Sequence, residues 1–194
     1  MQVDIRTTQD HDLDSFYELW SSPEITKTRG SGLASLVDFN NWIKSKKPTD
    51  LMFSLFVEDK YIGQLMYDNQ GRGIYVHIML LPEYQRQGIG PQVIGETLPT
   101  AYEKFGNRDV VALIKEENFN SIKMFCNLGF KYNGRGMTQN NNLLVRYTKK
   151  PIGGCHGAEE EDFNRNTVLR KRSSANSGRL YADGVLLRQE VSRI

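Results

Sequence analysis

The chain has 194 residues, which is enough for one substantial hydrophobic core and short for two. Its hydrophobic fraction of 39% and charged fraction of 25% are typical of a globular protein, and a formal net charge of +2 gives no overall attraction to nucleic acid or acidic lipid. Cys126 and Cys155 are its only cysteines, so we expect neither a disulfide framework nor a cysteine metal site.

The N-terminal segment carries acidic residues where a signal peptide needs an apolar core, and no apolar run is long enough to span a bilayer. We therefore predict a cytoplasmic protein that contacts no membrane. Residues 2–7 alternate apolar and polar side chains, as a half-buried strand does. Helices are predicted over about 10–20 and 33–46, where large apolar residues recur at helical spacing. The segment 21–32 between them contains Pro23 and two glycines and is predicted to be irregular.

Three strand-like runs follow in close succession, over 51–58, 61–68 and 72–81. Short turns join them, so they are predicted to pair antiparallel. The element order predicts an α/β (α+β) fold with a mixed, mostly antiparallel central sheet flanked by helices. The remaining predicted elements are a helix over about 91–105, a strand over 109–114, a helix over about 118–128, and two closing strands at 130–134 and 141–150.

The character of the chain changes after Lys150. Residues 151–194 mix Gly, Ser and Asn with blocks of like charge, a composition typical of a linker or tail. Asp183-Gly184 lies between two short apolar runs and indicates a possible short hairpin. We therefore predict a domain over 1–150, followed by a linker and extended arm.

The segment QRQGIG, at 85–90, separates the longest apolar strand from a helix predicted to begin at Pro91. Gly88 and Gly90 let a ligand approach the main chain, and free N–H groups at a helix N-terminus attract anions. Arg86 adds a positive charge. The spacing also fits an ordinary tight loop. It matches neither a dinucleotide fingerprint nor a Walker loop, because the third glycine and the Gly-Lys-Ser/Thr sequence are absent.

Gln85-x-x-Gly88-x-Gly90 resembles the acyl-coenzyme A signature Q/R-x-x-G-x-G/A of the GNAT superfamily of N-acetyltransferases. A second block, from Asn118 to Phe130, is similar to the asparagine-to-glycine-phenylalanine segment of that family. The distance between the blocks and the order of elements agree with it, and the resemblance covers about residues 2–148. It implies a GNAT-like sheet, acetyl-coenzyme A as co-substrate, and direct transfer to an amine in a ternary complex.

The resemblance also implies roles for individual residues. Main-chain N–H groups at 85–90 would bind the coenzyme A pyrophosphate, and the backbone at 80–81 would hydrogen-bond the pantetheine. The helix after Asn118 would lie beside the pantetheine arm. The implied coenzyme-binding residues are Leu80, Leu81, Gln85, Arg86, Gln87, Gly88, Ile89, Gly90, Asn118 and Phe125.

Two catalytic groups of the family pattern are missing. Phe125 stands where the family often has a tyrosine that protonates the departing thiolate, and the central strand lacks a carboxylate. His77 is our candidate base, since imidazole titrates near neutrality, although a solvated strand histidine is the plainer interpretation. Tyr84 is our candidate acid, and Tyr132 is an alternative that the residues do not exclude.

The sequence leaves three functions open. The first is an N-acetyltransferase acting on a small-molecule or protein amine without a metal, which the glycines and Gln85 favour. The second is a weak or inactive GNAT-fold structural protein, for example a virion component, anchored by residues 151–194. That arm would then contact a protein partner or a second copy, and the missing tyrosine and carboxylate favour this function. The third is a sensor that binds coenzyme A without turnover.

Overall fold

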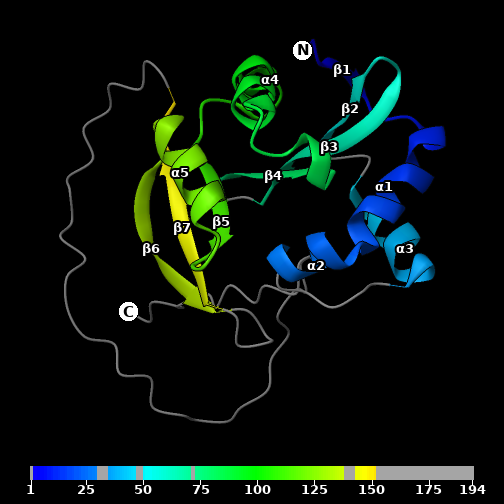
Figure 1. Ribbon diagram of the computed structural model, residues 1–194. Helices are drawn as coiled ribbons and strands as arrows, with labels where there is room; N and C mark the ends of the chain where they lie inside the picture. Colours follow the sequence, from blue (N-terminus) through cyan, green and yellow to red (C-terminus); the bar gives the residue numbers. More distant parts are fainter. Residues whose placement is uncertain (1, 30–34, 47–49, 71–72, 138–142, 152–194) are drawn as a thin grey trace, which may run out of the picture.

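A central sheet of seven strands, in the order β1-β2-β3-β4-β5-β7-β6, forms the middle layer of the described part of the computed structural model (Figure 1). The structure describes residues 2–29, 35–46, 50–70, 73–137 and 143–151. Neighbouring strands run antiparallel except for β4 and β5, which are parallel. The mixed, mostly antiparallel sheet predicted from the sequence is therefore confirmed.

The elements follow the predicted order along the chain. The strands are β1 (Asp4–Thr7), β2 (Leu51–Val57), β3 (Lys60–Asn69), β4 (Ile74–Leu80), β5 (Val110–Lys115), β6 (Lys131–Met137) and β7 (Leu143–Lys149). The helices are α1 (Leu13–Ser21), α2 (Pro23–Arg29), α3 (Leu36–Lys46), α4 (Ile89–Phe105) and α5 (Phe119–Asn127), with the 3-10 turns η1 (Asp10–Asp12) and η2 (Pro82–Tyr84).

Two expectations about helices were wrong. The segment predicted to be irregular contains α2, because proline is compatible with the first position of a helix and Pro23 occupies that position. The Ser22 hydroxyl supports this start by accepting the Ile25 N–H at 3.4 Å. Helix α4 begins two residues before the predicted start, so Pro91 is its third residue, where an N–H would also lack an intrahelical partner. The predicted arm and hairpin lie outside the described residues.

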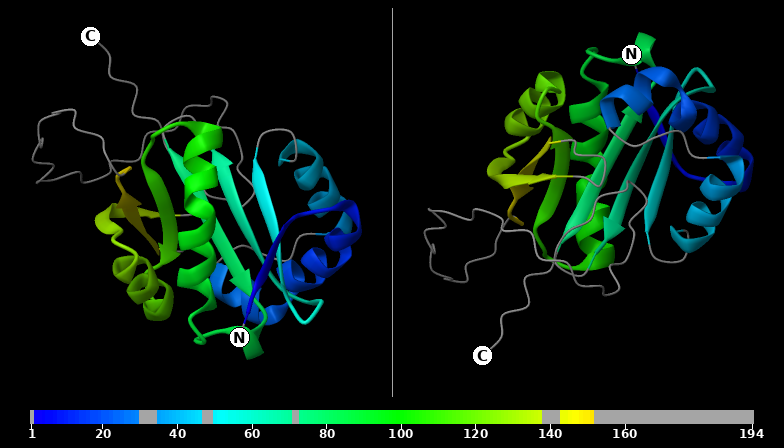
Figure 2. Two further views of the ribbon diagram at one scale, coloured as in Figure 1. Left: turned by 90° about the horizontal axis from the view of Figure 1, so that it is seen from above. Right: turned by 90° about the horizontal axis from the view of Figure 1, so that it is seen from below.

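The sheet separates two apolar cores. Ile74 and Val76 of β4 pack with α4 and α5 on one face, whereas Met79 packs with α1 and α3 on the other. This alternation follows from the period of two along a strand. Figure 2 shows α4 crossing one face of the sheet while α1, α2 and α3 lie toward the other. The position of a residue in β4 therefore decides which of the two faces its side chain occupies.

Strands β4 and β5 are hydrogen-bonded over only a short length. Their register pairs Ile74 with Val110 and Tyr75 with Val111, and no later pair follows in the described residues. Beyond these pairs the two strands diverge (Figure 1). The edge of β4 beyond Tyr75 therefore has no neighbouring strand on the β5 side, and this opening positions the candidate site.

Gly63 and Gly95 provide a matched test of this packing. A Cβ added at Gly63 of β3 would lie 2.4 Å from the Met79 carbonyl oxygen, a backbone atom that cannot easily move. We expect Gly63→Ala to lower the free energy of unfolding by about 2 kcal/mol, as for other overpacked sites. Gly95 lies inside α4 with open space around it, so Gly95→Ala should raise stability by about 0.5–1 kcal/mol. Urea unfolding measures both changes, and equal stability of the two variants would contradict the β3–β4 geometry.

Candidate functional site

The peptide groups at the end of β4 alternate in direction. The Leu81 N–H donates to the Ile62 carbonyl of the β3 side at 2.9 Å. Because hydrogen-bonding direction alternates along a strand, the peptide groups of Ile78 and Leu80 point toward the opening beside β5. The Leu80 N–H therefore faces the opening, whereas the Leu81 N–H is already used inside the sheet.

Gln85 braces the turn that follows. Its Nε2 donates to the Leu80 carbonyl at 2.8 Å, and its own backbone N–H donates to the Pro82 carbonyl at 3.2 Å. Gln87 adds a second brace through Nε2 to the Glu83 carbonyl. In this conformation neither the backbone N–H nor the side-chain amide of Gln85 is available to a ligand. The side chain instead fixes the path of the turn.

The next five residues hold the available donors. Within the described part of the chain, the N–H groups of residues 86–90 make no backbone hydrogen bond. The last of these residues open α4, a helix of 17 residues whose dipole is positive at this end. Gly88 has a φ of +81°, which favours glycine, and a Cβ built there would meet nothing within 4 Å. Space is therefore open at Gly88, beside N–H groups that lack backbone partners, and this arrangement is suited to phosphate.

Gly90 lies beside a side chain of the neighbouring helix. A Cβ added there would lie 2.6 Å from the Met124 sulfur of α5. Helix α5 therefore packs closely against the first turn of α4, and Gly90 is a contact between the two helices. The predicted contact of Gly90 with a ligand stays a prediction, and the structure adds a contact of this glycine with the Met124 side chain.

Asn118 and Phe125 lie at opposite ends of α5. Asn118 is the N-cap residue of that helix, and its side-chain oxygen accepts the Ser121 N–H at 3.2 Å. Phe125 is buried and packs edge-to-face on Phe130, with ring centroids 4.9 Å apart. The position that often holds a tyrosine in the family is thus part of the apolar core here.

The two predicted catalytic residues lie on different faces of the sheet. His77 is directly opposite Met66 of β3, which belongs to the core under α1 and α3. Tyr84 ends η2 and packs against the core under α4, and the Lys60 ammonium lies 5.3 Å from its ring centroid. The alternative acid, Tyr132, is exposed on β6 and packs edge-to-face against Tyr147. The structure therefore does not bring these predicted residues together at one point.

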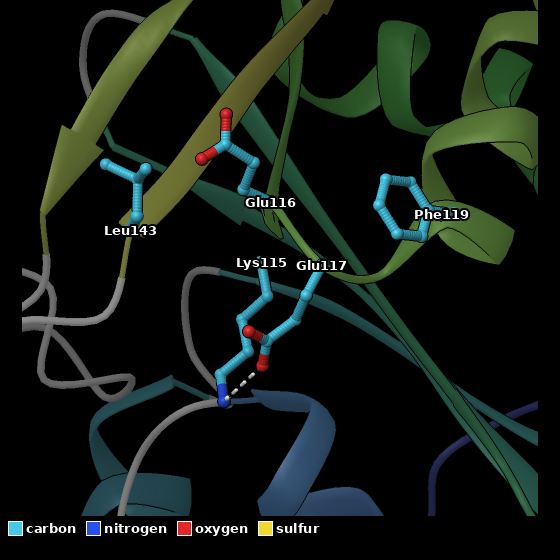
Figure 3. Close-up of a pocket in the computed structure, with 5 residues that line it drawn as sticks. All are labelled: Lys115, Glu116, Glu117, Phe119 and Leu143. Carbon is cyan, nitrogen blue, oxygen red and sulfur yellow. Dashed lines mark hydrogen bonds and ion pairs between the residues drawn. The ribbon is translucent and has the colours of Figure 1, made fainter.

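Two pockets flank helix α2. The first, which we call the α1–α2 pocket, has a volume of about 430 Å³ and adjoins the end of β4. The second, the β5 pocket, has a volume of about 270 Å³ and lies where β5 ends (Figure 3). The α1–α2 pocket is lined by Ser15, Glu18, Leu19, Ser22, Glu24, Lys60, Tyr61, Leu81 and Pro82, and the β5 pocket by Lys115, Glu116, Glu117, Phe119 and Leu143.

Helix α2 connects the two diverging halves of the sheet. The Lys115 ammonium at the end of β5 donates to the carbonyl of Lys27 in α2 at 2.8 Å, and lies 3.5 Å from the Glu117 carboxylate (Figure 3). Neither this connection nor the place of Glu18 and Tyr61 in a pocket was predicted from the sequence. These residues are far apart along the chain, and only the alternation around Tyr61 in its strand could have indicated which face it occupies.

In the described ranges, no helix combines the length and the apolar character needed to cross a bilayer. The same ranges contain no group of three or more His, Cys, Asp or Glu side chains able to hold a metal ion.

The chain belongs to the GNAT acetyltransferase family. Residues 2–131 match the family described as "Acetyltransferase (GNAT) domain", and this range includes β4, the braced turn and the whole of α5. A comparison with curated proteins finds no match by sequence. The family resemblance expected from the two sequence blocks is therefore confirmed.

Solved structures share the fold at low sequence identity. A spermidine N-acetyltransferase from Vibrio cholerae in complex with CoA and spermine has a TM-score of 0.68 at 15% identity, covering 77% of this chain and 96% of that one. An N-acetyltransferase from Staphylococcus aureus Mu50 has a TM-score of 0.67 at 20% identity, with 77% and 99% coverage. A ribosomal-protein-alanine N-acetyltransferase from Brucella melitensis has a TM-score of 0.66 at 17% identity, with 76% and 99% coverage.

Replacing Gln85 tests its bracing role. Gln85→Leu keeps the approximate size of the side chain but removes the donor to the Leu80 carbonyl. We expect the affinity for coenzyme A to fall by about threefold to tenfold, the equivalent of one hydrogen bond, because the turn is held less firmly. Isothermal titration calorimetry measures the affinity. An unchanged dissociation constant would show that the turn keeps its shape without this bond.

Proposed function

We propose that the protein is an acetyl-coenzyme A-dependent N-acetyltransferase that moves the acetyl group directly to a primary amine in a ternary complex. One observation carries the proposal: the N–H groups of residues 86–90 make no backbone bonds and lie at the positive end of α4, beneath open space at Gly88. An anionic diphosphate is the ligand that this arrangement suits best.

The opening between β4 and β5 suits the remainder of the co-substrate. Its pantetheine arm is an amide chain. The N–H and carbonyl groups of Ile78 and the N–H of Leu80 offer it strand-like hydrogen bonds on the side where β5 is absent. Bound acetyl-coenzyme A supplies an activated thioester. The Leu80 N–H is positioned to orient its carbonyl, while Gln85 keeps the Leu80 oxygen occupied.

The proposed proton carriers are separated by the sheet. His77 faces the side of α1 and α2, where an amine can approach, and is the proposed base for that amine. Tyr84 packs on the α4 side, where the turn would hold the coenzyme, and is the proposed acid for the departing thiolate. Asn118 caps α5 and so supports the coenzyme side through the position of that helix.

The acceptor is proposed to be an amine, and small molecules are the first class to test. The Vibrio cholerae neighbour was solved with CoA and spermine, and the Brucella melitensis neighbour is named for a protein acceptor. The division into a domain at 1–150 and an arm at 151–194 remains a proposal, as does partner binding by the arm. No described contact favours the virion-component alternative, since the arm lies outside the described residues.

Gly88 offers a charge test with a matched control. Asn and Asp both tolerate positive φ and both place a small side chain in the open space above the turn. Gly88→Asp adds a negative charge among the proposed diphosphate ligands, so we expect its coenzyme A affinity to be at least about tenfold below that of Gly88→Asn. Calorimetry on the two folded variants and the wild type measures this. Equal affinities, or no heat with the wild type, would contradict the proposed anion site.

Transfer itself requires a separate assay. The purified protein is incubated with labelled acetyl-coenzyme A and a panel of amines and peptides, and the label is followed into product. We expect transfer to at least one primary amine. Coenzyme A binding without transfer to any acceptor would instead favour the sensor function.

A further inference from the structure

The α1–α2 pocket has an apolar floor that is held in place by a buried polar network. Leu19, Tyr61 and Leu81 form the floor, and Leu81 leads directly into the braced turn. The Tyr61 hydroxyl donates to the Gln64 side-chain oxygen at 3.1 Å, and Gln64 Nε2 donates to the Thr8 hydroxyl at 2.7 Å. The Tyr61 ring is therefore fixed beside the end of β4.

The network also keeps Tyr61 uncharged. Burial, followed by the nearby charge of Asp12, raises the pKa of Tyr61 far above its ordinary value. The Asp12 carboxylate accepts the Ser54 hydroxyl at 3.0 Å inside the same network. The floor of the pocket therefore stays neutral at any pH at which the enzyme would work, and it suits a hydrocarbon chain.

The rim of the pocket carries uncompensated negative charge. The carboxylates of Glu18 and Glu24 make no hydrogen bond or ion pair with any described residue. The lysine of the rim, Lys60, is already engaged: its ammonium lies 3.4 Å from the Glu83 carboxylate and 5.3 Å from the Tyr84 ring centroid. The pocket lining thus carries two carboxylates without a described partner and one ammonium that is paired with Glu83.

These charges do not suit the reacting nitrogen. An amine attacks a thioester only in its neutral form, and a nearby carboxylate favours the protonated form. Glu18 and Glu24 would therefore hinder transfer if they held the reacting amine. They favour a substrate that carries a second amine. That amine would stay protonated and be bound by the two carboxylates, while the reacting amine lies nearer to Leu81.

We propose that the α1–α2 pocket binds an aliphatic diamine, with its methylene chain over Leu19, Tyr61 and Leu81 and its distal ammonium between Glu18 and Glu24. This inference rests on the proposed function and names its acceptor class. A volume of about 430 Å³ lies within the range of small-molecule sites, which is about 300–1,000 Å³. An acceptor with an anionic distal group is disfavoured by the same two carboxylates.

The test compares 1,5-diaminopentane with n-pentylamine, which has the same chain and no second ammonium. The wild type should acetylate the diamine with a kcat/KM about tenfold above that of the monoamine, through a lower KM. In the double variant Glu18→Gln/Glu24→Gln the ratio of the two kcat/KM values should fall close to one. Glu103→Gln, an exposed change on α4, is the control and should alter neither value.

A binding measurement separates this inference from the proposed function. Calorimetry should show the diamine binding to the wild type about tenfold more tightly than to the double variant, with coenzyme A affinity equal in both. Intact coenzyme A binding with no diamine binding, or a diamine preference that survives in the double variant, overturns the acceptor assignment alone. Loss of coenzyme A binding in the wild type would instead overturn the proposed function.

Discussion

The separation of β4 from β5 is the constraint on which the rest of the site depends. A parallel pair that continued along the full length of β4 would satisfy the peptide groups of Ile78 and Leu80 within the sheet. Because pairing stops at Tyr75 and Val111, those groups face an opening that crosses the sheet between its two cores. Helix α2 is tied to the end of β5 near the same opening by the bond from Lys115 to the Lys27 carbonyl.

The turn after β4 converts this opening into a candidate binding site. Its shape depends on one side chain, since Gln85 ties the turn back to the last carbonyl of β4, and on Gly88, which supplies a positive φ. The two motif glycines therefore act differently: Gly88 shapes the loop beneath open space, and Gly90 allows Met124 of α5 to approach α4. The same short segment thus combines the proposed ligand site with a contact between two helices.

Much of the fold could be predicted because its signals are local. Alternation identified the strands, and the glycines with Pro91 located the turn and the helix after it. Helix α2 was missed because Pro23 was interpreted as a helix breaker, although proline is compatible with the first helical turn. The contact at Gly90 could not be predicted, since the Met124 side chain beside it lies on another helix.

The two sides of the candidate site were predictable to different degrees. The coenzyme side follows from one continuous segment and a family resemblance that is confirmed. The proposed acceptor side is built from α1, α2, β3 and the end of β4, which come together only in the folded chain. Tyr61 and Glu18, for example, are brought to one pocket by tertiary packing, and no local pattern marks them as neighbours. The unusual phenylalanine at 125 was visible in the sequence, but its burial against Phe130 was not.

The most direct measurement of the central claim is a heteronuclear NMR titration of the ¹⁵N-labelled chain with coenzyme A. If the backbone N–H groups of residues 86–90 bind the diphosphate, their amide resonances should shift more than any others, and the shifts should saturate with ligand. Saturable shifts confined to other parts of the chain, or no shift at the turn at saturating coenzyme A, would contradict the account.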